Sequence, residues 1–198
     1  MTSFLNFIAE LFKGDKTQNL TQHHKDENTY YFHEDYYCQI EFLPKESFDN
    51  VSKIAEEVTE FSEQRFDGNG WTGCYVRNEA SFPTKDKKIP ATDIADFLKQ
   101  HDFWEYSKVT TGYSSQVIPC ENTRAFKKHS IVICFDYEEN FLKNIWLNSS
   151  PEQVDNSIYK TFLLSIATKY NFLLADWWKS IVVDVSNPNE IEKYFEFE

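Results

Sequence analysis

The sequence is poor in the residues that mark loop-dominated or repetitive proteins, with only five Gly, six Pro and one Met. That scarcity argues against a disordered chain, a collagen-like repeat or a scaffold made mainly of loops. No internal repeat of fixed period is present, and the four cysteines form no C-x-x-C pair. The chain of 198 residues is long enough for one domain with an appendage.

Familiar catalytic and cofactor motifs are also absent. The glycines of residues 67–73 lack both the G-x-G-x-x-G spacing and the P-loop lysine. The histidines show no H-x-x-x-H or H-E-x-x-H pattern. A thiol–imidazole pair of Cys120 with His101 or His129 would need the two side chains within hydrogen-bond reach, and nothing in the sequence sets that distance. The sequence therefore predicts no catalytic residue, no metal site and no cofactor.

Acidic and aromatic residues are what the chain has in abundance. Its formal net charge is −12, and it holds 18 Phe, 11 Tyr and 5 Trp. The aromatics supply enough apolar area for a well-packed core. The negative field repels phosphate groups and attracts basic proteins. We therefore expect no nucleic-acid partner, and we expect a positively charged protein as the partner.

Three features predict a cytoplasmic protein with reduced thiols. The first ten residues have no basic region and no small-residue cleavage site, and the apolar stretch 162–178 is interrupted by Lys169, Asn171 and Asp176. We therefore expect no membrane association. Cys38 and Cys134 lie inside apolar, strand-like runs, where thiols behave as small buried hydrophobes.

The hydrophobic pattern divides the chain into two parts. Residues 1–29 read as an amphipathic helix that ends near Gly14, followed by a polar linker, and residues 30–198 read as a single domain. In that domain the pattern predicts strands at 36–43, 71–77, 130–137, 141–147, 172–177 and 180–185, one or two strands within 103–117, and helices at 47–66, 92–98, 150–170 and from 187.

This order of elements predicts an α+β fold. Long helices return between strands, but hairpins dominate the middle and the end of the chain, so the sheet should be mostly antiparallel with helices packed on one face. The N-terminal helix is then an appendage. The run 131–135 is apolar at every position, which predicts a strand that is covered on both faces.

The outer face of the helix predicted at 47–66 is strongly acidic. Glu56, Glu60 and Glu63 follow the i, i+4, i+7 spacing that places side chains on one side of a helix. Such a face is either solvated surface that keeps the protein soluble or a docking surface for a basic partner, with nearby aromatics as anchors. On the second interpretation the candidate partner-binding residues are Asp49, Glu56, Glu57, Glu60, Glu63, Trp177 and Trp178.

In general character the chain resembles the small, acidic, aromatic-rich immunity proteins that bacteria encode beside secreted polymorphic toxins. The resemblance rests on charge and composition, so it transfers no residue roles. It implies a non-catalytic protein that neutralises a basic toxin domain by direct complex formation. Two alternatives stay open: an acidic secretion chaperone that dimerises and binds an extended effector segment, and an enzyme of unrecognised type. The sequence does not indicate an oligomeric state.

Overall fold

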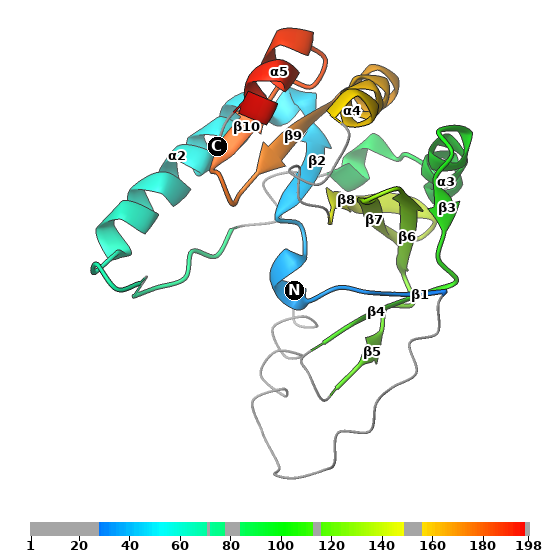
Figure 1. Cartoon of the computed structure of the whole chain (residues 1–198), viewed down its shortest axis with the longest axis horizontal. Coiled ribbons are helices and arrows are strands. Elements are labelled where there is room, and N and C mark those ends of the chain that lie inside the picture. The colour runs from blue at the N-terminus through cyan, green and yellow to red at the C-terminus, as the bar shows by residue number, and fades with distance from the viewer. Residues whose placement is uncertain (1–27, 71, 78–83, 113–115, 149–155, 197–198) are drawn as a thin grey trace.

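The computed structural model describes residues 28–70, 72–77, 84–112, 116–148 and 156–196. Most of the described strands form one sheet, in which every neighbouring pair runs antiparallel. From edge to edge its strands are β10 (Ile181–Val183), β9 (Phe172–Asp176), β2 (Ile40–Pro44), β8 (Phe141–Leu147), β7 (Ile131–Glu138), β6 (Thr123–Lys128) and β3 (Trp104–Glu105). The predicted α+β fold with a mostly antiparallel sheet is confirmed (Figure 1).

A second, smaller sheet lies below the main one in Figure 1. It contains β1 (Thr29–Tyr31), β4 (Lys108–Thr111) and β5 (Ile118–Pro119), with β4 in the middle. Strand β1 runs parallel to β4 and β5 runs antiparallel to it. The predicted strand content of 103–117 is confirmed by β3 and β4.

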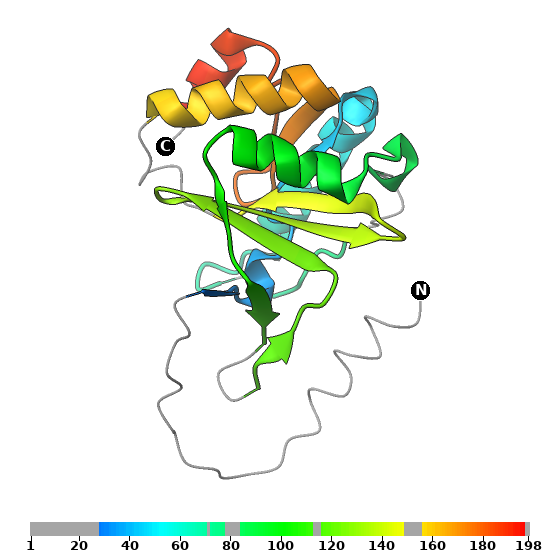
Figure 2. The same cartoon turned by 90° about the vertical axis from the view of Figure 1, so that its right-hand side faces the viewer.

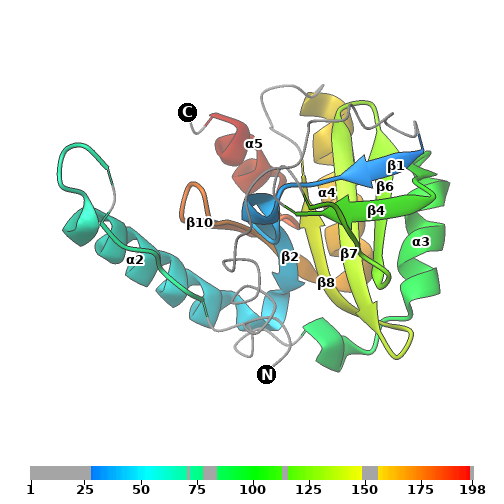
Figure 3. The ribbon, with the colours of Figure 1, turned by 90° about the horizontal axis from the view of Figure 1, so that it is seen from below.

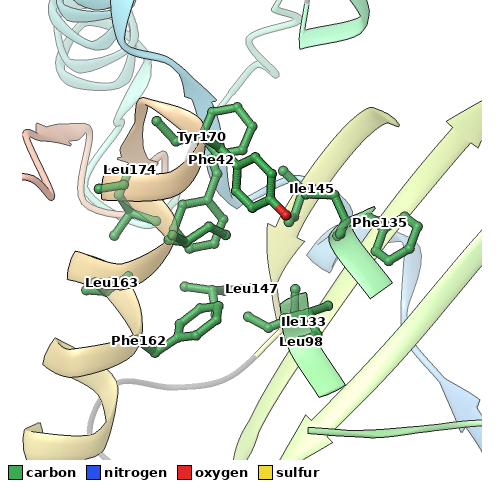
Figure 4. Packing of buried hydrophobic residues seen from close by; sticks show 14 of the residues in the cluster. Phe42, Leu98, Ile133, Phe135, Ile145, Leu147, Phe162, Leu163, Tyr170 and Leu174 are labelled. Carbon is green, nitrogen blue, oxygen red and sulfur yellow. The ribbon is translucent and has the colours of Figure 1, made fainter. Parts of the chain in front are cut away.

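Three helices cover one face of the main sheet: α3 (Ala91–Gln100), α4 (Asn156–Tyr170) and α5 (Pro188–Glu196) (Figure 2). The core lies between them and the sheet. The rings of Phe42 on β2 and Phe162 on α4 meet edge to face, with centroids 6.2 Å apart (Figure 4). Burying one such side chain stabilises the fold by about 1.5–3 kcal/mol.

The opposite face of the sheet is covered in two parts. The small sheet lies over β6, β7 and β8, where Trp146, Cys134 and Phe32 form a second apolar cluster. Helix α2 (Phe48–Arg65) lies over β2 and β9, where Val51 and Ala55 pack against the sheet. One helix thus departs from the predicted one-face arrangement, because β9 is apolar on both faces and needs cover on both.

Strand β7 matches its prediction closely. Ile131, Ile133 and Phe135 point into the helix-covered core, and Val132 and Cys134 point into the cluster beneath the small sheet. Its hairpin with β8 turns at residues 139 and 140, both of which have positive φ.

Other boundaries differ from the sequence predictions. Strand β2 is shorter than 36–43, and all five of its residues are buried rather than alternately exposed. The predicted strand at 71–77 is wrong for residues 72–77, which are irregular because they run along α2 and pair with no strand. Ser47 makes no side-chain capping bond at the start of α2. The N-terminal helix and the start of the helix predicted at 150 fall outside the described residues.

Candidate functional site

Helix α2 projects past the edge of the main sheet and leaves a groove beside it. Figure 3 shows the second half of this helix extending away from the body, with residues 66–70 and 72–77 as a segment that returns along it. The groove has a volume of about 480 Å³ and opens between α2 and β10. It is lined by Ser52, Ala55, Glu56, Thr59, Glu60, Ser180, Ile181 and Val182.

Two of the predicted docking carboxylates, Glu56 and Glu60, therefore face the sheet edge across this groove. Helical periodicity places Asp49 and Glu63 on the same side of α2, towards its two ends, and all four residues are exposed. Glu57 is turned away from them, because it accepts a hydrogen bond from the Tyr75 hydroxyl at 3.0 Å. The structure thus groups four of the five predicted carboxylates.

The returning segment holds the outer half of α2 in place. The rings of Phe61 and Tyr75 meet with centroids 5.5 Å apart. At the end of the segment the Arg77 guanidinium donates to Glu41 Oε1 at 2.6 Å and to the Cys38 carbonyl at 3.0 Å. Because this pair lies on the sheet, α2 is tied to the body at the end of the returning segment as well as at its own start.

Of the two predicted tryptophan anchors, one is buried. Trp177 is only 6% exposed and donates its indole N–H to Glu41 Oε1 at 2.7 Å, so it belongs to the packing under α2 and cannot reach a partner. Trp178 is 60% exposed and meets Tyr36 edge to face, with centroids 6.4 Å apart. Trp178 belongs to the turn that leads into β10, so it lies close in sequence to the groove lining.

Sequence reasoning missed Glu41 and Arg77. Glu41 occupies a polar position of a strand that was predicted to be half-buried, yet the residue is 6% exposed. Arg77 closes a stretch that was predicted to be a strand. The polar residue within an apolar run was the only signal for this buried ion pair.

A second hollow, of about 360 Å³, lies between the small sheet and β6 and includes Cys120. Burial, reinforced by the nearby Asp136 carboxylate, raises the pKa of the Cys120 thiol to about 11, so the thiol stays protonated at neutral pH. His101 lies on the opposite side of the sheet, against Phe97 and Phe162 of the helical layer. The structure therefore does not bring Cys120 and His101 together.

The polar groups around this hollow are engaged with one another. Arg124 binds Glu105 at 2.7 Å, and Lys99 binds the same carboxylate at 3.1 Å. Asp136 accepts hydrogen bonds from the Tyr37 and Thr123 hydroxyls, each at 2.6 Å. Burial raises the pKa of Asp136 despite these bonds. These contacts link β3, β6 and β7 of the main sheet with α3 and with the segment before β2.

All four cysteines are free thiols, and Cys38 and Cys134 are buried as predicted. Within the described ranges, no group of three or more His, Cys, Asp or Glu side chains could hold a metal ion. None of the helices in that part of the chain is long and apolar enough to cross a membrane.

Fold and site together define an α+β domain with an acidic groove at one edge of an antiparallel sheet. Comparisons of the chain with protein-family models, with curated proteins and with solved structures return no match.

Proposed function

We propose that this chain is a non-catalytic binding protein whose groove between α2 and β10 docks a basic protein. More specifically, we propose that the chain is an immunity protein that neutralises a cognate toxin domain by direct complex formation. The observation that carries the proposal is the placement of Glu56 and Glu60, which line a concave surface instead of a convex, fully solvated helix face.

Charge and shape support this assignment. The net charge of −12 steers positively charged partners towards the chain, and two carboxylates, Glu56 and Glu60, line the groove where such a partner would dock. The exposed ring of Trp178, at 60% exposure, supplies an aromatic anchor of the kind that dominates binding energy at interfaces. The second hollow offers a protonated thiol and mutually paired charges, which favours a structural role there.

The test measures association with the protein that co-purifies with this chain from its native cells. Glu56→Lys combined with Glu60→Lys should slow association about tenfold at low salt and flatten its salt dependence, because steering acts on the on-rate. Glu121→Lys combined with Glu196→Lys is the control: both residues are exposed and lie outside the groove, and the net charge changes equally.

For an immunity protein, the wild-type chain should also relieve growth inhibition by the partner's toxic domain, and the groove variant should relieve it less. Equal association rates for the two double variants would overturn the proposal. A dimeric chain bound to a partly unfolded partner would instead indicate a secretion chaperone.

A further inference from the structure

The free edge of β10 forms one wall of the groove. Strand β10 is the last strand of the main sheet, and no described strand pairs with its outer side. The direction of its backbone groups follows from the hydrogen bonds of its inner neighbour, β9.

On the inner side of β9, the Trp177 N–H donates to the Gln39 carbonyl at 2.8 Å and the Lys45 N–H donates to the Asn171 carbonyl at 2.9 Å. Odd-numbered residues of β9 therefore direct their backbone groups towards β2. Backbone groups alternate in direction along an antiparallel strand, so Leu174 and Asp176 direct theirs towards β10.

Leu174 pairs with Val183, and Asp176 pairs with Ile181. The residue between them, Val182, must then direct its N–H and its C=O away from the sheet, into the open edge. Two residues further on, the edge ends, because the Asp184 N–H donates to Glu190 Oε2 of α5 at 2.9 Å. The edge thus presents a single outward-facing donor and acceptor pair, at Val182.

The side chain of Val182 indicates which face of a strand paired to the open edge of β10 would lie towards α2. Val182 packs against the apolar cluster beneath α2 that contains Val51 and Ala55. A residue paired directly opposite Val182 has its side chain on the same face of the sheet. That side chain would point towards Glu56 and Glu60, which share the groove with Val182.

We propose that the groove takes an extended segment of a basic partner, which hydrogen-bonds to the Val182 backbone and directs Lys or Arg side chains at alternate positions towards Glu56 and Glu60. This inference rests on the proposed function and specifies the form of the docking segment. Main-chain pairing to a sheet edge supplies affinity in such complexes, and alternate side chains supply specificity.

A second copy of this chain is a poor occupant of the groove. Pairing of two β10 edges would bring together the acidic α2 helices of two chains that each carry a net charge of −12. Strand β10 itself, Ile181–Val183, has no basic side chain to offset that repulsion.

The experiment uses the full chain and a synthetic peptide in which Lys alternates with Thr. Amide hydrogen exchange in the free protein should be faster at Val182 than at Ile181 and Val183, and the peptide should slow exchange at Val182. A peptide of the same composition with its lysines in one block should bind several-fold more weakly, because only some of its charges can face α2. Unchanged exchange at Val182 with the peptide in excess would overturn the inference.

The matched variants are Val182→Pro and Val182→Ala. Proline removes the outward N–H and leaves the β9–β10 hydrogen bonds intact, whereas alanine truncates the side chain and keeps the N–H. Val182→Pro should weaken peptide binding about fivefold beyond Val182→Ala, as expected for one lost hydrogen bond. If Glu56→Lys with Glu60→Lys abolishes binding but the two Val182 variants bind equally, edge pairing is wrong while acidic docking stands.

Discussion

The guanidinium of Arg77 lies over the ring of Trp177, with its central carbon 4.3 Å from the ring centroid, and both side chains hydrogen-bond to Oε1 of Glu41. The three groups join the returning segment, β2 and the turn after β9. A buried carboxylate lowers stability unless it is paired. Here the Arg77 cation and the Trp177 indole N–H both pair with the Glu41 carboxylate. The contact therefore explains how a helix that projects past the sheet keeps a defined position.

Removal of the Arg77 cation should lower the free energy of unfolding. Arg77→Met leaves Glu41, whose side chain is 9% exposed, without its opposite charge, and should lower the free energy of unfolding by about 3 kcal/mol. Urea denaturation measures this cost. The control is Lys53→Met: Lys53 is 73% exposed and 3.9 Å from Glu57, so its loss should change stability by less than about 0.5 kcal/mol. Similar costs for the two variants would mean that the buried pair does not hold the segment.

Stability should depend on pH through Asp176, which is 1% exposed. Burial raises the pKa of its carboxyl, although the Tyr194 hydroxyl and the Lys179 backbone N–H donate to it. The folded state therefore binds a proton more readily than the unfolded state, and the ionised carboxylate lowers stability at neutral pH. Relative to Asp176→Asn, the wild-type chain should gain stability as the pH falls from 7 to about 4, the ordinary pKa of Asp.

Asp184 should give stability the opposite pH dependence. Burial acts to raise its pKa, but hydrogen bonds from Lys45 and Ser186 outweigh burial and the pKa is lowered. Relative to Asp184→Asn, the wild-type advantage should stay nearly constant from pH 7 down to about 4 and fall at lower pH. Urea midpoints from pH 7 to below 4 test both carboxyls, and parallel curves for the two variants would contradict the opposite directions of the two pKa shifts.

Hydrogen exchange should be slowest in β7. This strand pairs with β6 on one side and β8 on the other, and its residues Ile131–Phe135 are covered on both faces. Their amides should therefore open only with global unfolding, whereas those of edge strand β10 should open locally. Native-state exchange read by NMR compares the two strands, and equal protection would show that the sheet does not open from its β10 edge.

The local hydrophobic pattern was sufficient to predict elements that pair with a neighbour in the sequence. The hairpin of β7 and β8 follows from two apolar runs joined by a turn, and the antiparallel pair of β9 and β10 follows from two short apolar runs close together in the chain. Residues 72–77 contain a shorter apolar run, 74–76, yet they are not a strand. A strand needs a partner for its backbone groups, and this segment lies beside a helix.

The sequence by itself determined the α+β class, the aromatic core and the grouping of Glu56, Glu60 and Glu63 on one side of a helix, because these depend on composition and on periodicity along the chain. Only the tertiary structure decided that this helix side opens onto the edge of β10 and that Trp177 is buried while Trp178 is exposed. Both outcomes depend on how distant segments pack, since the Glu41 carboxylate on β2 binds the Trp177 indole and Arg77 at once.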